Sequence, residues 1–235
     1  IQEVLADSGD FSIFRNASDN ASIPAGGAQV QVSWDTVVTE NANIDLLGGG
    51  TTIDLMEGGK YLVLYNVWAE DTAVGSNNRR SFDTYLTING LELAYGRGDG
   101  YIRDSNEDDK FGYASGGAII DVSAGDDLVI NIARDDTNTD VNNNIRAGVN
   151  GVSSVKMNDD FNYARLQKLA RSANISGNTT FTAVDWDSSD ELDTGAFTFS
   201  PTSEDITLKG DSGQYFMTNV IVRINQDANS SVRQN

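Results

Sequence analysis

The stretch GGKYLVLYNVWAED, residues 58–71, carries the strongest signal for the fold of this chain. Successive side chains of a strand point to opposite faces, and here both alternating sets are apolar: Tyr61, Val63, Tyr65, Val67 and Ala69 on one face, and Leu62, Leu64 and Trp68 on the other. The pattern predicts a β-strand buried on both faces, one against a core and the other against a second layer or subunit. The candidate interface residues are Tyr61, Val63, Tyr65 and Trp68.

The segments downstream of this strand also read as β-structure. In YLTINGLELAY (residues 85–95), Asn89-Gly90 is the preferred pair for a type I′ turn between two antiparallel strands. Such a turn places Ile88 opposite Leu91 and Thr87 opposite Glu92. The stretch AIIDVSAGDDLVINIA (residues 118–133) adds two strands joined through residues 123–127. The fold class predicted from these patterns is all-β.

The opening stretch has a counterpart near the end of the chain, SGQYFMTNVIVRINQDANSSVRQN (residues 212–235). VQVSWD (residues 30–35) likewise recurs as FTAVDWD (residues 181–187). The repeat predicts two tandem modules, residues 1–160 and residues 161–235, with the second incomplete. It also favours a strand for DDFNYARLQKLARSA (residues 159–173), whose apolar spacing alone fits an amphipathic helix as well.

The early end of the second copy, before any counterpart of the Asn-Gly hairpin, leads to an expectation about the chain itself. We expect it to be a piece of a longer protein. Residues 1–160 alone should then fold, whereas residues 161–235 alone should aggregate or stay unfolded, because their apolar strands would lack a facing sheet.

The order of these motifs resembles the C1q/TNF-like jelly-roll family. The resemblance rests on a Phe-rich first strand, a tryptophan-containing strand, a Gly-x-Tyr strand, an Ile-Asn-Gly hairpin and an Ala-Gly-Asp turn, at residues 11–14, 34, 59–68, 88–90 and 122–132. It implies an antiparallel two-sheet jelly-roll sandwich, assembled as a trimer, that serves as an extracellular recognition or structural head. Tandem modules of this kind are also similar to parts of viral surface fibres, virion decoration proteins and large secreted bacterial proteins.

Composition excludes several function classes. The 235 residues contain neither His nor Cys, which removes thiol nucleophiles, histidine bases and ordinary zinc sites, so we expect no catalytic residues and no enzyme. With 16 basic against 35 acidic residues the net charge is −19, which repels nucleic-acid phosphates and anionic lipids. Because no apolar run approaches the roughly 20 residues of a spanning helix, membrane insertion is not expected either.

Acidic clusters in predicted loops are candidates for metal binding. DSNEDD (residues 104–109), DDTNTD (residues 135–140) and DSSDELD (residues 187–193) supply oxygen ligands of the kind that calcium prefers. The candidate metal ligands are Asp135, Asp136 and Asp140, although no cluster matches the EF-hand pattern. The alternative is a solvated acidic surface. No cofactor is required on either interpretation.

Two kinds of short motif are candidates for surface recognition or modification. Arg97-Gly98-Asp99 is a tripeptide that can engage integrins from an exposed loop, and a simple turn is the alternative. Five N-x-S/T sequons permit glycosylation where the machinery exists, at Asn16, Asn20, Asn174, Asn178 and Asn229.

The sequence as a whole predicts a non-enzymatic extracellular structural module of a multi-domain fibre or particle-surface protein, such as a virion fibre or decoration protein. The expected location is extracellular, at a cell surface or at a virion surface. The expected partners are copies of the same chain, as a trimer, or neighbouring modules of the same protein. The alternative is an extracellular recognition or adhesion module that binds a glycan or a protein receptor, with or without calcium.

Overall fold

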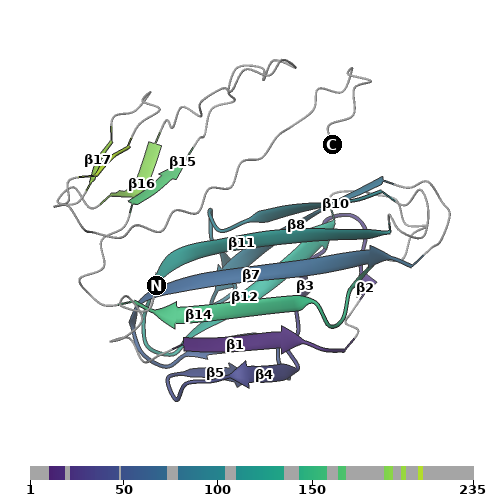
Figure 1. Ribbon diagram of the computed structural model, residues 1–235, viewed down its shortest axis with the longest axis horizontal. Coiled ribbons are helices and arrows are strands. Elements are labelled where there is room, and N and C mark those ends of the chain that lie inside the picture. Colours follow the sequence, from purple (N-terminus) through teal and green to yellow (C-terminus); the bar gives the residue numbers. More distant parts are fainter. Residues whose placement is uncertain are drawn as a thin grey trace. The chain divides into compact units, whose positions relative to one another are not determined.

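The computed structural model describes residues 11–18, 22–47, 49–72, 79–103, 110–134, 143–157, 164–167, 188–192, 197–199 and 206–208. Within these residues the secondary structure is entirely β, without a helix. The chain passes from one compact unit to another between Asp159 and Asp160. The described strands of the first unit run from β1 to β14, and those of the second from β15 to β18 (Figure 1).

The first sheet of the first unit is built around its longest strand, β7. On one side β7 pairs with β11, and on the other it pairs with β14 and then β13. Beyond β14 lie β1 and then β4, while β2 pairs with β13, and every pairing is antiparallel. The strands of this sheet are β1 (Phe11–Asn16), β2 (Ser22–Ile23), β4 (Thr36–Thr39), β7 (Gly59–Asp71), β11 (Phe111–Val122), β13 (Asn143–Ile145) and β14 (Asn150–Lys156).

The second sheet has the order β10-β8-β12-β6-β5, with β3 against β12 and β9 against β8. Its strands are β3 (Val30–Gln31), β5 (Ile44–Leu47), β6 (Thr52–Leu55), β8 (Arg79–Ile88), β9 (Leu91–Glu92), β10 (Gly98–Arg103) and β12 (Asp126–Arg134). Since β6, β8 and β12 belong to this sheet and β7 and β11 to the other, the chain crosses repeatedly between layers (Figure 1). The predicted antiparallel two-sheet jelly-roll sandwich is confirmed.

The core lies between the two sheets and follows the alternation of β7. Tyr61, Val63, Tyr65, Val67 and Ala69 are all buried, whereas the intervening residues are partly or largely exposed. The second sheet contributes alternate residues of β8 and β12 to this core, among them Phe82, Leu86, Leu128, Ile130 and Ile132. The intervening Tyr85, Thr87, Val129 and Asn131 point to the other face and are buried too. One face of β7 is therefore buried within a single chain, whereas the other is partly exposed, and its burial against a second layer or subunit stays a prediction.

Two local predictions for the first unit are confirmed, and a third is corrected. Asn89 and Gly90 have φ of 51° and 78°, as a type I′ turn requires, and the strands pair in the predicted register. Residues 118–133 do contain two strands, which lie in different sheets. The strand predicted to contain Trp34 ends at Gln31 instead, because the chain then leaves the second sheet. Trp34 is fully buried at this crossing, where its backbone N–H donates to the carbonyl of Gly50 at 2.6 Å.

The described part of the second unit consists of two antiparallel strand pairs. β15 (Ala164–Gln167) pairs with β16 (Ser188–Leu192), and β17 (Phe197–Phe199) pairs with β18 (Ile206–Leu208). β15 confirms the preference for a strand over a helix within residues 159–173. Trp186 and residues 212–235, which carry the repeat, lie outside the described residues, so the homologous second module and its boundaries stay a prediction.

Candidate functional site

The outward side of the first sheet carries an apolar surface that crosses four strands. The register places Ile119 of β11 and Val155 of β14 on either side of Leu62, with Phe11 of β1 beyond Val155. Leu64, the next outward residue of β7, is 38% exposed. We call this surface the open face, and its residues are Phe11, Leu62, Leu64, Trp68, Tyr113, Ile119 and Val155.

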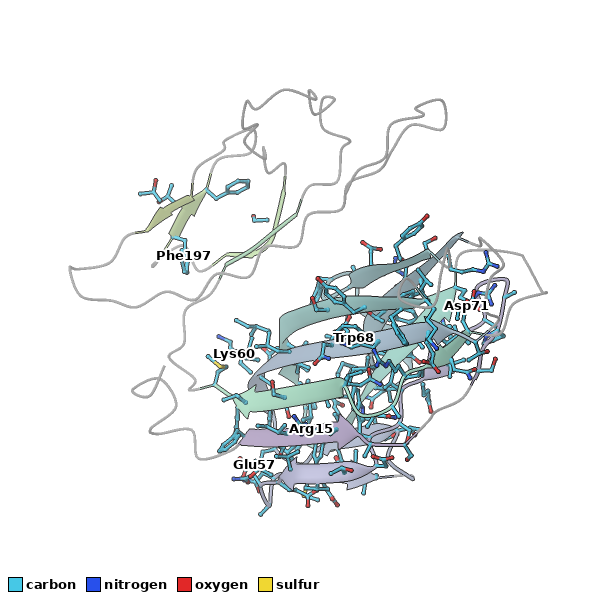
Figure 2. The ribbon with its side chains drawn as sticks, turned by 45° about the vertical axis from the view of Figure 1, so that its right-hand side comes forward. Arg15, Glu57, Lys60, Trp68, Asp71 and Phe197 are labelled. Atoms are coloured by element: carbon cyan, nitrogen blue, oxygen red, sulfur yellow. The ribbon has the colours of Figure 1, made fainter. Side chains whose placement is uncertain are left out.

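One end of the open face is aromatic. Trp68 and Tyr113 are cross-strand partners whose rings stack with centroids 5.2 Å apart, and Tyr113 is 60% exposed. The guanidinium of Arg146 lies 5.8 Å from the Trp68 ring centroid and 3.9 Å from that of Phe111, within cation–π range. Figure 2 shows Trp68 on β7, among the side chains of this sheet. A half-exposed cluster of this composition is typical of a binding surface.

Of the four candidate interface residues, the structure places only Trp68 on the open face. Tyr61, Val63 and Tyr65 point the other way, into the core between the sheets, and are at most 4% exposed. Apolar alternation alone did not distinguish the two faces of β7, and the position of the second sheet decides between them. Leu62 and Leu64 are the β7 residues that share the face of Trp68. The interface itself stays a prediction.

The candidate calcium ligands Asp135, Asp136 and Asp140 lie outside the described residues, as does the cluster at residues 104–109. Within the part of the chain that the structure describes, no three acidic side chains gather closely enough to hold a metal ion. The choice between a calcium site and a solvated acidic surface therefore stays open for these loops.

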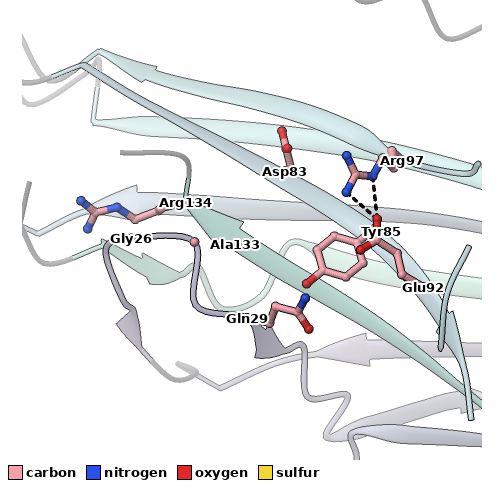
Figure 3. Close-up of a pocket in the computed structure, with 9 residues that line it drawn as sticks. Gly26, Gln29, Asp83, Tyr85, Glu92, Arg97, Ala133 and Arg134 are labelled. Atoms are coloured by element: carbon pink, nitrogen blue, oxygen red, sulfur yellow. Dashed lines mark hydrogen bonds and ion pairs between the residues drawn. The ribbon is translucent and has the colours of Figure 1, made fainter. Parts of the chain in front are cut away.

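A second surface feature is a shallow hollow of about 380 Å³ on the outward side of the second sheet (Figure 3). We call it the outer hollow. At its rim, Arg97 Nε donates a hydrogen bond to Glu92 Oε1 at 3.0 Å, and the two side chains form an ion pair. The Arg97 guanidinium also lies 5.5 Å from the centroid of the Tyr85 ring. The hollow is lined by Gly26, Gly27, Gln29, Asp83, Tyr85, Glu92, Arg97, Ala133 and Arg134.

Tyr85 is the unusual member of this lining. It is only 2% exposed, and its buried hydroxyl has no hydrogen-bond partner among the residues that the structure describes. Burial raises the pKa of the Tyr85 phenol to about 12, with nearby Glu92 adding to the effect and Arg97 opposing it. Sequence reasoning missed this hollow because its residues come from separate segments of the chain and form no motif.

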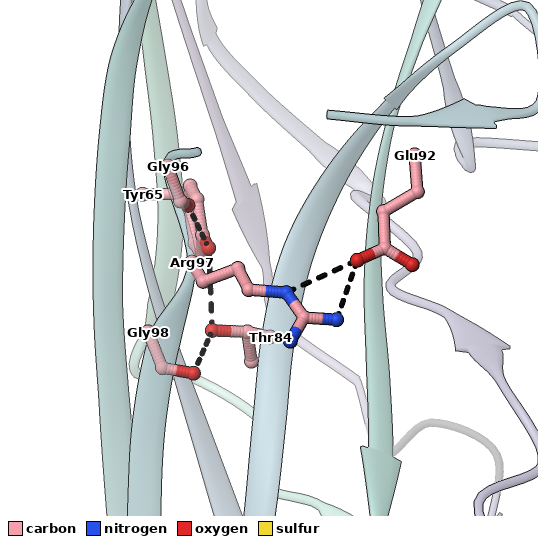
Figure 4. A network of polar contacts seen from close by, with 6 residues as sticks. All are labelled: Tyr65, Thr84, Glu92, Gly96, Arg97 and Gly98. Atoms are coloured by element: carbon pink, nitrogen blue, oxygen red, sulfur yellow. Dashed lines mark hydrogen bonds and ion pairs between the residues drawn. The ribbon is translucent and has the colours of Figure 1, made fainter. Parts of the chain in front are cut away.

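The Arg97-Gly98-Asp99 tripeptide is neither an exposed loop nor a simple turn. Gly98 and Asp99 begin β10, where they pair with Thr84 and Asp83 of β8, and Gly98 is buried. The Thr84 hydroxyl donates to the Gly98 carbonyl at 3.1 Å (Figure 4). Arg97 is held by Glu92. Both interpretations of the tripeptide, an exposed integrin-type loop and a simple turn, are therefore corrected, because strand pairing encloses its central residue.

The sequon at Asn16 is also closed off by the fold. Asn16 is 1% exposed, and its Nδ2 donates to the carbonyl of Ser33 at 2.8 Å, so the amide is inaccessible to glycosylation in the folded chain. Asn20, Asn174, Asn178 and Asn229 lie outside the described residues.

Asp35 fastens the end of β1 to the start of β4. Its carboxylate accepts hydrogen bonds from the backbone N–H groups of Ala17 and Ser18, at 2.6 and 2.8 Å, and from the hydroxyls of Ser18 and Thr36. Partial burial would raise its pKa, but these hydrogen bonds together outweigh burial and lower the pKa from 3.8 to about 2.

Three aspartates lie in a row across the outward side of the second sheet, each on a neighbouring strand. Asp54 of β6 is the direct cross-strand partner of both Asp45 of β5 and Asp127 of β12. Asp54 Oδ1 is buried and has no hydrogen-bond partner within the described ranges of the chain. Like charges directly opposite each other destabilise a sheet, so this row weakens the fold locally.

Comparisons with known proteins concern the fold. No family model and no curated protein matches the chain. Among solved structures, murine APRIL at pH 8.5 is similar with a TM-score of 0.43 and 12% identity, over 63% of this chain and 98% of that one. The globular domain of zebrafish complement 1qA has a TM-score of 0.41 and 13% identity, over 65% and 99%. The structure of Eiger TNF from S. frugiperda has a TM-score of 0.38 and 14% identity, over 70% and 98%.

The strand order of the first unit is that of an antiparallel two-sheet jelly roll. Each layer carries one surface feature on its outward side, the open face on the first sheet and the outer hollow on the second. No helix with the length and apolar character of a membrane span occurs among the described residues.

Proposed function

We propose that this chain is a non-enzymatic, extracellular structural module of a multi-domain fibre or particle-surface protein, and that it assembles as a homotrimer through the open face. The observation that carries the proposal is the apolar composition of that face. Monomeric soluble proteins rarely present a contiguous apolar surface across several strands unless a partner covers it. Leu62 and Ile119 are direct cross-strand partners on it, and Leu64, the next outward residue of β7, is 38% exposed.

The distribution of charge supports assembly between identical chains. Among the outward positions of β7 and β11, carboxylates occur only at the ends, at Glu70 and Asp121. Between them lie apolar, aromatic or small polar residues, although the chain carries 35 acidic residues in total. Two copies of a chain with a net charge of −19 repel each other unless the carboxylates stay outside the contact.

The aromatic end of the open face supplies the residues that commonly dominate interface energetics. Trp, Tyr and Arg are over-represented among such positions, and Trp68, Tyr113 and Arg146 form one cluster here. The rings are already stacked in the single chain, so little side-chain freedom is lost when a partner covers them. The absence of His and Cys from the sequence supports the non-enzymatic part of the proposal.

Analytical ultracentrifugation of paired variants tests the assembly. Leu64→Asp places a carboxylate in the middle of the open face, where a desolvated charge has no partner. Leu91→Asp is the matched control, because Leu91 is 75% exposed in β9 on the other sheet. We expect the wild type and Leu91→Asp to sediment at three times the chain mass and Leu64→Asp at the chain mass, all with the same far-ultraviolet circular dichroism.

A wild type that sediments at the chain mass, or a Leu64→Asp variant that sediments with the wild type, would contradict the proposal. Trp68→Asp provides a second test at the aromatic end of the face and should dissociate the assembly in the same way. Electron microscopy of the full-length protein then tests the wider claim, since a structural module should occur in ordered fibres or on particle surfaces.

A further inference from the structure

The outer hollow combines a cavity with an unsatisfied buried hydroxyl. In Figure 3 the Tyr85 ring lies between Arg97 and Gln29, with its hydroxyl directed toward the side of Gln29. Arg97 covers the face of the ring, and the Tyr85 hydroxyl has no hydrogen-bond partner in the described part of the chain. A buried hydroxyl without a partner destabilises a fold, and native structures contain few of them. Its position beside a cavity indicates a partner that comes from another molecule.

The lining offers donors and acceptors side by side. The carboxylates of Asp83 and Glu92 accept, the Arg97 guanidinium donates, and the Gln29 amide and the Tyr85 hydroxyl do both. Gln29 is itself exposed and lies on the side toward which the Tyr85 hydroxyl points in Figure 3, so a change in its side-chain rotamer would open access to the phenol. Adjacent hydroxyl groups on a ligand, each able to donate and accept, match such a lining. The volume of about 380 Å³ accommodates one sugar residue with room for its substituents.

The charges in and around the hollow select against ionic ligands. Two carboxylates line it beside two guanidiniums, and Arg97 is already paired with Glu92. An anionic ligand would approach against the field of a chain with a net charge of −19. A cationic ligand would compete with Arg97 for Glu92 and leave the Arg97 guanidinium without its partner. An uncharged ligand leaves the rim ion pair intact.

We propose that the outer hollow is a binding site for an uncharged sugar residue of a glycan, with the Tyr85 hydroxyl as the central hydrogen-bonding group. The Gln29 and Asp83 side chains bind further hydroxyls of the sugar, and the Arg97–Glu92 pair forms the rim. This site lies on the second sheet, whereas the proposed assembly uses the first. The two proposals can therefore fail independently.

Saturation-transfer difference NMR on the full chain tests the site, because it detects weak ligands of large assemblies. The probes are the methyl glycosides of glucose, galactose, mannose, fucose and N-acetylglucosamine. The charged comparisons are the methyl glycoside of N-acetylneuraminic acid, with its carboxylate free, and a lysine-rich peptide. We expect saturable transfer to at least one uncharged glycoside. Tyr85→Phe removes only the hydroxyl and should weaken this binding roughly tenfold or more, the loss expected for one well-placed hydrogen bond.

Tyr101→Phe is the matched control, because Tyr101 is an exposed tyrosine of β10 on the same sheet, outside the hollow. It should bind the same glycoside as the wild type does. Without sugar, Tyr85→Phe should also raise the melting temperature, since it deletes an unsatisfied buried group, whereas Tyr101→Phe should leave it unchanged. A purely structural role of the hydroxyl would instead lower the melting temperature of Tyr85→Phe.

Three results would overturn the proposal. The first is the absence of saturable transfer to every uncharged glycoside. The second is equal binding by the wild type and Tyr85→Phe. The third is transfer only to the sialoside or only to the lysine-rich peptide, which would assign the hollow to a charged ligand.

Discussion

Gly116→Ala should destabilise the sandwich from within, because Gly116 provides the space for a buried tyrosine. Gly116 of β11 is the direct cross-strand partner of Tyr65 of β7. A Cβ at position 116 would meet the Tyr65 hydroxyl and, at 2.5 Å, the Gly96 carbonyl oxygen, and real Cβ atoms essentially never lie so close. The same hydroxyl donates to the Gly96 carbonyl at 2.6 Å and lies 3.3 Å from Thr84 Oγ1 (Figure 4).

The expected loss combines two contributions. Displacing the Tyr65 hydroxyl from the Gly96 carbonyl removes a buried hydrogen bond, which contributes about 1 kcal/mol. Forcing a methyl group into a packed core costs a further 1–3 kcal/mol, as an order of magnitude. A total of about 2–4 kcal/mol corresponds to a fall in melting temperature of roughly 5–15 °C for a chain of this size. Urea unfolding and calorimetry measure both quantities.

A nearby glycine supplies the control for this experiment. A Cβ at Gly151 of β14 would lie 3.4 Å from Asn66 Oδ1, which is close to ordinary contact. Gly151→Ala should therefore change the free energy of unfolding by less than about 1 kcal/mol.

A double-mutant cycle tests the contact between position 116 and the Tyr65 hydroxyl directly. Tyr65→Phe removes the hydroxyl that the added methyl group would meet, so Gly116→Ala should cost less in the Tyr65→Phe background than in the wild type. Additive losses, or a Gly116→Ala variant as stable as the wild type, would refute the packing of the Tyr65 hydroxyl over Gly116.

Three further predictions follow from electrostatics. Asp54→Asn should raise the free energy of unfolding by about 0.2–1 kcal/mol in urea titrations, since it relieves the like-charge row, and a loss of stability would contradict that interpretation. Asp35→Asn should lower stability by about 1 kcal/mol at neutral pH. The pKa of Asp35 is lowered to about 2 in the folded chain, so its carboxylate stabilises the fold fully above pH 3.8 and loses this effect as the pH falls toward 2. A stability difference between the wild type and Asp35→Asn that does not shrink between pH 3.8 and 2 would refute the lowered pKa. Calcium bound by Asp135, Asp136 and Asp140 would stabilise the fold by mass action, so exhaustive chelation should lower the melting temperature and added magnesium should restore it poorly. An unchanged melting curve after chelation would favour the interpretation of these loops as a solvated acidic surface.

The sequence by itself determined the local elements and, through their order, the fold class. Apolar alternation over residues 61–70 identified the central strand, because opposite orientation of successive side chains is a property of any extended chain. Asn89-Gly90 identified a tight hairpin and its register, because both residues tolerate positive φ and the turn fixes which residues face each other. The resemblance in motif order then led to the two-sheet jelly roll.

Only the tertiary structure decided which residues are available at the surface. Both faces of β7 are apolar, so the packing of β8 and β12 determined that Tyr61, Val63 and Tyr65 are core residues while Trp68 lies on the open face. Asn16 and the Arg97-Gly98-Asp99 tripeptide looked accessible as short motifs, but pairing with other strands, β14 for Asn16 and β8 for Gly98, encloses both residues.

The outer hollow depends in the same way on segments that are distant in the chain. Gln29, Tyr85 and Arg97 meet only because β3 and β8 both pair with β12 and the segment after β9 returns over the same sheet. Local propensities specify strands and turns, because they depend on a few neighbouring residues. Burial, hydrogen-bond satisfaction and the shape of a cavity depend on what lies opposite, and that is settled only when the two sheets pack.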